Sequence, residues 1–482
     1  MPGFASRGLA VLGALAVGGL VAGCADSARS SPPVFASTGG GGVGGAGVGG
    51  STGGGAGSPL TGLGGSASGG QTGWGGQAGQ ATGTGGAAIA TGGSGGSGAG
   101  GTPNVLAPPA RVGLVSLNSD GQTTSLSLLD SSGAPATGVC VHSATLPNGF
   151  SKTISGDAVL PSQPQRGGDI VLVDRGNGEL TFVDPSGCFI ARQIAIPGGA
   201  GAAPHDVVTV SDHKAYVTRN QATAAASGQA AAGNDVIAID PTNGNYLARI
   251  GLDTYASKSA GAQVQARPDR ALIADGRVVV SLNQSDVARA MFGDGSVVII
   301  DPANDAVLAS VALPGLYDCE GMEFFPASHM LLVACGGGAA GRDQPLQSGI
   351  AVVDLGAAPP RLDHVISSVA FNGRPLSSGW VVGAPSAGAP NRAFAGTSDP
   401  RHIAPDAVFG FDFASGTVTP VITAATASVG SSGVANQLLF VPEALAAGPK
   451  VQLVDVTGVP QPLSGFATDP KNGLPPRAVA WY

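Results

Sequence analysis

Charged and aromatic side chains are scarce in this sequence. Only 11% of its 482 residues are charged and 5% are aromatic, and the formal net charge is −8. No run of Lys or Arg occurs along the chain. A nucleic-acid binder needs a clustered positive surface, so the sequence excludes nucleic acid as an expected partner.

Cysteine and histidine are also few, with five Cys and six His in the whole chain. They form no CxxCH haem-attachment motif, no HExxH motif and no zinc-spaced Cys/His cluster, and no acidic series resembles an EF-hand loop. The sequence therefore predicts no cofactor. A metal site is left open, because carboxylates distant in sequence can still meet in the fold.

Long apolar runs are missing except near the N-terminus, which reads "MPGFASRGLAVLGALAVGGLVAGCADS". The run from Leu9 to Leu20 is too short to span a bilayer and is typical of a secretory signal. "VAGC" at 21–24 resembles the bacterial lipobox, which implies that residues 1–23 are a lipoprotein signal peptide and that Cys24 is acylated. This predicts a membrane partner through the lipid at Cys24 and a location in the bacterial cell envelope, in the periplasm or at the cell surface. An ordinary signal peptide with a chance Cys is the alternative.

Glycine is abundant, with 81 residues, and it dominates the segment that follows. Within residues 24–107, the stretch 38–102 is almost entirely Gly, Ser, Thr and Ala with almost nothing to bury, and the charged side chains of residues 1–109 are Arg7, Asp26 and Arg29. Such a segment cannot offset the entropy of ordering its backbone. We predict a disordered tether.

The rest of the chain, residues 108–482, repeats one unit. Apolar alternating runs end in Asp at intervals of 43 to 61 residues: Asp130, Asp184, Asp240, Asp301, Asp354, Asp412 and Asp455. Each run is flanked by further short strand patterns, which gives four strands per unit. Seven such units predict an all-β, seven-bladed β-propeller of four-stranded antiparallel blades. The repeated Asp is expected to begin a tight turn.

The two ends of this region are complementary. The first unit begins at "ARVGLVSLN" (110–118) without an inner strand, and the chain ends in "PPRAVAWY" (475–482), which has the pattern of that missing strand. The C-terminal strand is therefore predicted to complete the first blade and remove exposed edges. We expect the closed ring to be a monomer.

One stretch carries a family resemblance. "KAYVTRN" (214–220) followed by "DVIAIDPTNGNYLARI" (235–250) resembles the YVTN-type β-propeller repeat of bacterial secreted and surface-layer-like proteins. That family is similar in shape to the lactonase and quinoprotein amine dehydrogenase propellers. The resemblance implies the fold and brings no catalytic motif with it.

The long irregular segments and the sparse charges are predicted to share one face. In a blade numbered from the inside, the connections before the first strand and after the second emerge on the same face, whereas the Asp turns lie on the other. Loops on a rigid scaffold commonly carry binding sites. The candidate ligand-binding residues at this mouth of the central channel are His205, Asp206, Arg219, Arg267, Asp269, Glu320, Arg401 and His402. The alternative is that they are solvated loop ends.

Two disulfides are expected in an exported protein. Cys319 and Cys335 flank the turn at 326–329 and are predicted to face each other across an inner hairpin. Cys140 and Cys188 pair by elimination, with free thiols as the alternative for either pair.

Two functions remain open from the sequence. One is a lipid-anchored binding or interaction scaffold for a protein, glycan or small polar ligand. The other is a periplasmic enzyme or electron-transfer partner resembling the lactonase or quinoprotein propellers. Convergence of Asp206, Asp269 and Glu320 at metal-ligand distance would favour the enzyme. Without a catalytic motif, the sequence favours the scaffold.

Overall fold

The structure is a computed structural model. It describes residues 109–144, 152–222, 233–259, 262–338, 347–398, 405–424, 428–444 and 448–482. The predicted signal peptide, the tether, Cys24, Arg401 and His402 lie outside the described residues.

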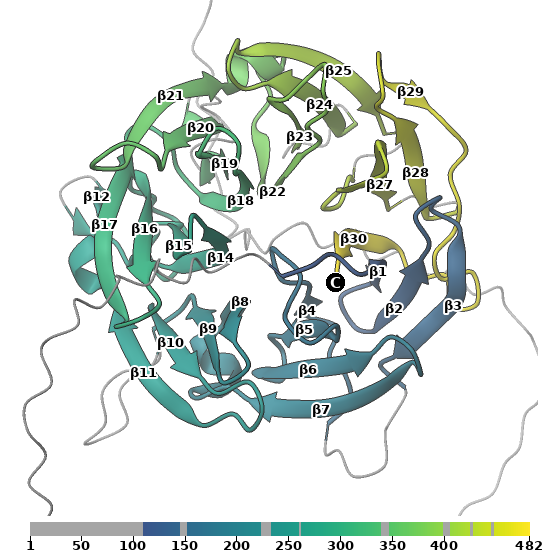
Figure 1. Cartoon of the computed structure of the whole chain (residues 1–482), viewed down its shortest axis with the longest axis horizontal. Helices are drawn as coiled ribbons and strands as arrows, with labels where there is room; N and C mark the ends of the chain where they lie inside the picture. Colours follow the sequence, from purple (N-terminus) through teal and green to yellow (C-terminus); the bar gives the residue numbers. More distant parts are fainter. Residues whose placement is uncertain are drawn as a thin grey trace, which may run out of the picture. The chain divides into compact units, whose positions relative to one another are not determined.

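The described chain forms seven four-stranded antiparallel sheets arranged as blades around a central channel (Figure 1). From the channel outward, blade 1 contains β30 (Pro476–Trp481), β1 (Leu114–Ser119), β2 (Thr124–Leu129) and β3 (Pro135–His142). Blade 2, in the same inner-to-outer order, contains β4 (Ala158–Val159), β5 (Ile170–Asp174), β6 (Glu179–Asp184) and β7 (Phe189–Ala195). Blade 3 contains β8 (Pro204–Ser211), β9 (Lys214–Arg219), β10 (Asp235–Ile239) and β11 (Tyr246–Gly251).

The remaining four blades repeat this order. Blade 4 contains β14 (Pro268–Ala274), β15 (Arg277–Leu282), β16 (Gly295–Asp301) and β17 (Ala306–Leu313). Blade 5 contains β18 (Cys319–Phe325), β19 (Met330–Cys335), β20 (Gly349–Asp354) and β21 (Arg361–Ser367). Blade 6 contains β22 (Leu376–Gly383), β23 (Arg392–Thr397), β24 (Ala407–Asp412) and β25 (Thr417–Thr423). Blade 7 contains β26 (Gly433–Ala435), β27 (Leu438–Glu443), β28 (Lys450–Asp455) and β29 (Gln461–Pro462). The predicted all-β propeller is confirmed.

Short elements connect the blades. They are the 3₁₀-helices η1 (Gly199–Ala202), η2 (Asp253–Tyr255) and η4 (Ser368–Phe371), and the two-stranded pair β12 (Lys258–Ser259) and β13 (Ala262–Gln263). No helix in the described ranges is long and apolar enough to cross a membrane.

The hydrophobic core lies between neighbouring blades rather than at the centre. Seven clusters of buried side chains fill the seven blade-to-blade interfaces. One of them packs Phe182 of blade 2 against Val217 and Ile237 of blade 3. A middle strand is therefore covered on both faces, which explains why runs such as "SVVIID" (296–301) are continuously apolar and buried except at the closing Asp301. The outer strand β17 has one solvated face, and its burial alternates.

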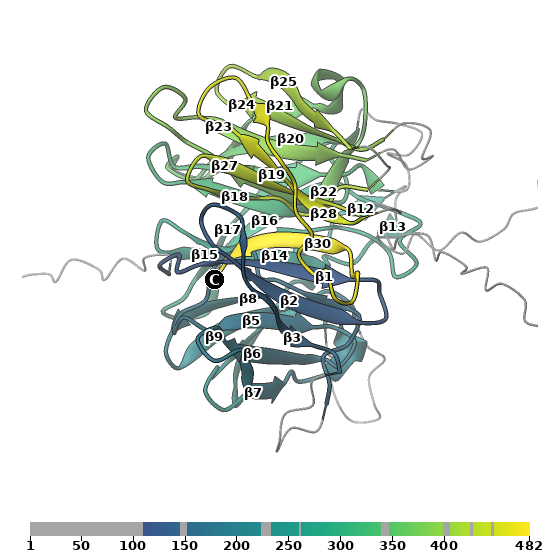
Figure 2. The ribbon, with the colours of Figure 1, turned by 90° about the vertical axis from the view of Figure 1, so that its right-hand side faces the viewer.

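The C-terminal strand closes the ring as predicted. β30 pairs antiparallel with β1, with Leu114 opposite Trp481 and Ser116 opposite Val479. Beyond the strand, Tyr482 exchanges backbone hydrogen bonds with Val112 and Gly113. In the side view of Figure 2, the yellow β30 lies against the dark blue β1. The two ends of the described chain thus form one blade.

The repeated Asp residues have the structural role predicted for them. All seven end the third strand of a blade or directly follow it, and each carboxylate accepts a hydrogen bond from a backbone N–H two or three residues later. At Asp184, for example, the Ser186 hydroxyl and N–H lower the pKa of the carboxyl. These turns all lie on the face where the inner strands end.

Both predicted disulfides are present. Cys319–Cys335 joins directly opposed residues of β18 and β19, and Cys140–Cys188 joins the outer parts of blades 1 and 2. Cys188 lies in the turn before β7, and Cys140 lies within β3.

Candidate functional site

The inner strands enclose a central channel with a volume of about 860 Å³. One opening lies where the inner strands begin, and we call it the mouth. His205, Asp269, Asp318, Glu320 and Arg289 line the channel there. The loops that follow the second strands emerge on the same face, as the sequence predicted.

His205 and Asp269 form a buried pair at the mouth. Each lies at the start of the inner strand of its blade, and His205 Nδ1 lies 2.7 Å from Asp269 Oδ2 with both side chains almost fully enclosed. Asn220 donates a hydrogen bond of 3.3 Å to the same carboxylate oxygen, and Arg270 Nε lies 3.5 Å from Asp269 Oδ1. The imidazole is therefore held in a fixed orientation by a carboxylate that is itself fixed.

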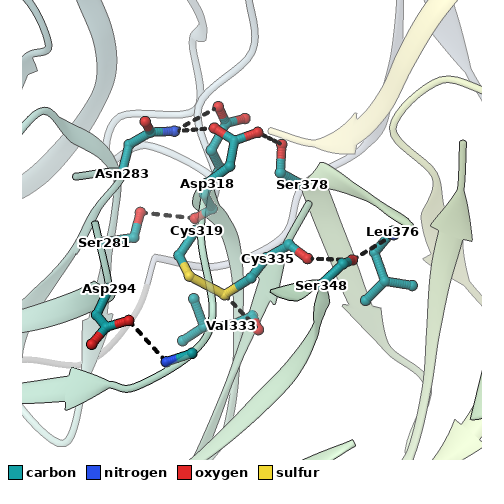
Figure 3. Close-up of a disulfide and its surroundings, with 12 residues drawn as sticks. Ser281, Asn283, Asp294, Asp318, Cys319, Val333, Cys335, Ser348, Leu376 and Ser378 are labelled. Atoms are coloured by element: carbon teal, nitrogen blue, oxygen red, sulfur yellow. Dashed lines mark hydrogen bonds between the residues drawn. A yellow bond between two sulfur atoms is a disulfide. The ribbon is translucent and has the colours of Figure 1, made fainter. Parts of the chain in front are cut away.

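Asp318 and Glu320 form a second acidic group in blade 5, on either side of Cys319 in the sequence. Figure 3 shows Asp318 near the disulfide. Asn283 Nδ2 donates to Asp318 Oδ1 and, at 3.2 Å, to Glu320 Oε1. Ser378 donates its hydroxyl to Asp318 Oδ2 at 3.3 Å. Cys319 lies between the two acids in sequence, so the Cys319–Cys335 bond fixes the backbone that carries them.

Arg289 reaches toward these acids from the loop between β15 and β16. Its Nη1 lies 4.0 Å from Glu320 Oε1, and the side chain is 17% exposed. Burial alone would lower the pKa of Arg289, but the carboxylates of Glu320, Asp318 and Asp269 outweigh burial and raise it. The charged guanidinium is therefore stabilised by these three acids, of which Glu320 lies 4.0 Å away.

The other predicted site residues that the structure describes lie behind the channel surface. Asp206 is fully buried; burial raises its pKa, and its carboxylate accepts hydrogen bonds from Ser162, from its neighbour Val207 and from the backbone N–H of Ala271. Arg219 pairs with buried Asp235, and Arg267 donates to Asn220 Oδ1 and to the Asp286 carbonyl. These three support the mouth from behind.

Sequence reasoning missed Arg289, Asp318 and Arg270 as mouth residues. Asp318 stands directly before an inner strand, close to the position that His205, Asp269 and Glu320 share, so the same rule could have included it. Arg270 lies two residues inside its strand, and the sequence could not say which way it points. Arg289 belongs to a segment marked only as an irregular loop.

The three carboxylates whose convergence would favour an enzyme do not converge. The Asp206 carboxylate accepts hydrogen bonds from the Ser162 hydroxyl and the Ala271 N–H, whereas Asp269 and Glu320 line the channel. Within the described residues, no group of three or more His, Cys, Asp or Glu side chains could hold a metal ion.

The opposite opening is crossed by the segment that enters the propeller. Figure 1 shows the chain reaching β1 from the centre of the ring, and Pro109 and Arg111 line the channel. Arg111 lies 4.0 Å from Glu323 of blade 5 and 5.7 Å from the ring of Trp481 in blade 1. The entry segment (residues 109–113) therefore lies across the channel at this end.

Glu323 makes the propeller's stability depend on pH. Burial raises the pKa of its carboxyl from 4.5 to about 7, against a smaller opposing effect of Arg111. The protein is therefore most stable with respect to this group below pH 4.5, where the Glu323 carboxyl is neutral, and it loses that stability as the pH rises through about 7.

Glu323→Gln is therefore expected to stabilise the protein more at pH 8 than at pH 5, by about 2 kcal/mol. Urea denaturation of both proteins at the two pH values measures the difference. Asp212→Asn, on an exposed turn, is the control and should show no such dependence. An equal effect of Glu323→Gln at both pH values would contradict the burial argument.

Comparisons with known proteins do not indicate a function for this chain. No protein-family model matches the chain, and no curated protein matches it. Among solved structures, the hydrazine synthase of Kuenenia stuttgartiensis is 15% identical, with a TM-score of 0.44, covering 65% of this chain and 80% of that one. A proposed 6-phosphogluconolactonase from Bacteroides uniformis is 12% identical, with a TM-score of 0.46, covering 77% of this chain and 99% of that one. A dihydro-haem d1 dehydrogenase is 12% identical, with a TM-score of 0.44, covering 77% of this chain and 76% of that one. At these values none of the three informs the chemistry of the mouth, and membership of the YVTN repeat family stays a prediction.

Proposed function

We propose that this protein is a cell-envelope binding propeller that takes a small polar ligand at the mouth of its central channel. The observation that carries the proposal is the concentration of fixed, partly enclosed charged groups at one end of an 860 Å³ channel, in a chain with very few charges. Sites for small molecules are usually concave and place a few convergent polar groups on a rigid frame.

The rigidity of these groups supports a binding role. Asn220, Asn283 and Ser378 donate hydrogen bonds to the acids, and a disulfide joins the strands beneath Asp318 and Glu320. A ligand that meets preset groups loses less ordering free energy on binding. The opposite face offers the repeated Asp turns, whose carboxylates are already engaged by their own backbone.

A thermal-shift screen of small polar metabolites, followed by calorimetric titration of the hits, tests this proposal. Glu320→Gln and Asp318→Asn are each expected to weaken a hit about tenfold, because each removes a charged partner from the mouth. Asp240→Asn in a turn of the opposite face is the matched control and should bind with unchanged affinity.

Equal affinity in both mouth variants, or a loss in Asp240→Asn, would show that the ligand binds elsewhere. Conversion of a hit to product, lost in His205→Asn, would replace the binding role by a catalytic one that uses the His205–Asp269 pair.

We also propose that the propeller is held at a membrane by lipid on Cys24, as the "VAGC" context indicates. Cys24→Ala should then move the protein from the membrane fraction to the soluble fraction. A mature N-terminus at any other residue, found by mass spectrometry, would remove this part of the proposal.

A further inference from the structure

The two disulfides differ in how well the fold covers them. Cys319 and Cys335 are fully buried, and both belong to the core cluster between blades 4 and 5. Cys140 and Cys188 are partly exposed and lie at the edge of the cluster between blades 1 and 2. A thiol can attack a disulfide only where it can reach a sulfur atom. Of the two bonds, Cys140–Cys188 is therefore the one that a thiol can approach in the folded protein.

Cys188 also stands at a turn position that other blades give to residues suited to a left-handed backbone. The position is the fourth after the repeated Asp, and its φ is +51° at Cys188. In blades 3, 4 and 6 the φ at this position is +62° to +79°, and the residues there are Gly244, Asp305 and Gly416. Glycine adopts such a φ without steric cost, and Asp adopts it more readily than most residues do. The turn alone does not explain a cysteine at 188, whereas its bond to Cys140 does.

This bond is a staple between two blades. Cys140 lies in β3, the outer strand of blade 1, and Cys188 directly precedes β7, the outer strand of blade 2. The core between these blades is formed by fully buried side chains such as Leu126 and Ile170, and the two cysteines pack against its edge. Opening the bond removes a covalent link between the blades and leaves their core in place. The ring can therefore stay folded in both redox states.

We infer that Cys140–Cys188 is a thiol-exchange site which a dithiol reduces in the folded protein, and that its redox state sets how firmly blades 1 and 2 are joined. Exposed disulfides are typically the labile and regulatory ones, whereas buried disulfides resist reduction. The inference is independent of the proposed ligand site, because neither cysteine is among the residues that line the channel.

The exchange has two balanced steps. One thiolate of the dithiol attacks one sulfur of the bond, the S–S bond breaks, and the other cysteine leaves as a thiolate. The second thiolate of the dithiol then attacks the mixed disulfide and releases the remaining cysteine. The dithiol is oxidised to its own disulfide, and Cys140 and Cys188 receive two electrons and, from solvent, two protons.

Trapping of thiols in the unmodified protein tests the accessibility. The folded protein is incubated with dithiothreitol at pH 8, and free thiols are alkylated with iodoacetamide and located by peptide mapping. Cys140 and Cys188 should be alkylated about tenfold faster or more than Cys319 and Cys335. In urea that unfolds the chain, the two pairs should react at similar rates, because burial no longer distinguishes them.

The melting temperature and hydrogen exchange test the effect on the ring. The bond closes a loop with a sequence separation of 48 residues, so its reduction should lower the melting temperature by about 5 °C. Reoxidation with oxidised glutathione should restore the original value. Amides of β3 and β7 should exchange faster in the reduced protein, while those of β18 and β19 should be unchanged.

Two double variants assign the effect to the staple. Cys140→Ser/Cys188→Ser should melt like the reduced protein and should not respond to dithiothreitol. Cys319→Ser/Cys335→Ser is the matched control and should still respond. The trapping experiment needs no variant, so it distinguishes the two disulfides even where this control folds poorly.

The turn position has a test of its own. In a Cys140→Ser background, Cys188→Gly should melt about 2 °C higher than Cys188→Ala, because glycine adopts the positive φ without strain. The reverse order would show that the turn does not favour glycine at 188.

Four results would overturn the inference. They are equal alkylation rates for the two cysteine pairs in the folded protein, no alkylation of Cys140 and Cys188 before the chain unfolds, an unchanged melting temperature after their reduction, or a lowered one that reoxidation does not restore.

Discussion

Removal of residues 476–482 is expected to abolish the folded propeller. β30 is the inner strand of blade 1, and its deletion exposes one edge of β1 together with Leu114, which is now 1% exposed. It also removes Val479 from the core between blades 7 and 1 and breaks the Trp481 Nε1 hydrogen bond to the Val434 carbonyl. The lost burial alone amounts to about 5 kcal/mol or more, which is comparable with the whole stability of many domains.

A point substitution tests the same closure more gently. Val479→Asp buries a carboxylate in the interface between blades 7 and 1 and should destabilise the ring by about 3 kcal/mol or more. Val459→Asp, the same change at a side chain that is 79% exposed, is the matched control and should have little effect. Soluble yield and urea denaturation compare the variants. A truncated protein that unfolds like the full chain would show that the ring does not need β30.

Asp235→Ala is expected to have the second large effect. Asp235 is fully buried in blade 3 and forms two hydrogen bonds with Arg219, 2.8 Å to Nε and 2.7 Å to Nη2. It also accepts a hydrogen bond from Arg249. Removal of the carboxylate leaves the buried Arg219 charge without its main partner, which costs about 3 to 5 kcal/mol.

Arg249→Ala provides the comparison for this site. The Arg249 side chain is 33% exposed, so its removal takes away a partly solvated partner and should cost about 1 kcal/mol or less. Urea denaturation measures both variants at neutral pH. Similar small losses in the two would show that Arg219 is compensated by its bond to the Pro197 carbonyl rather than by Asp235.

The fold could be predicted from the sequence because each blade is encoded by a local pattern that repeats along the chain. The third strand of each blade is an alternating or continuously apolar run that ends at an Asp. The carboxylate of this Asp accepts a hydrogen bond from a backbone N–H of the turn that follows, as at Asp130 and Asp184. Such turns depend on neighbours two or three residues away, so the pattern is visible in the chain. The missing inner strand at 110 and the extra strand at 476–481 likewise determined how the ring closes. The pairing of Cys319 with Cys335 followed from the same hairpin register.

The site was only partly predictable, because its residues meet through the tertiary structure. The sequence could place His205, Asp269 and Glu320 at the starts of inner strands, and these side chains do line the channel. It could not distinguish them from Asp206, whose side chain points into the contact with Ser162 and Ala271 because successive residues of a strand face opposite ways. At the irregular start of β8, a shift of one residue decides whether His205 or Asp206 reaches the channel.

The sequence by itself determined the number of blades, their strand order, the closing strand and the face that carries the irregular loops. Only the tertiary structure decided that Arg289 lies 4.0 Å from Glu320 and that Asp318 and Asp269, from two neighbouring blades, also stabilise its charge. Residues within one blade are related by a short hairpin register that local patterns encode. Residues from different blades meet through the packing of whole sheets and the path of a long loop. No local sequence pattern therefore predicts the position of such a side chain.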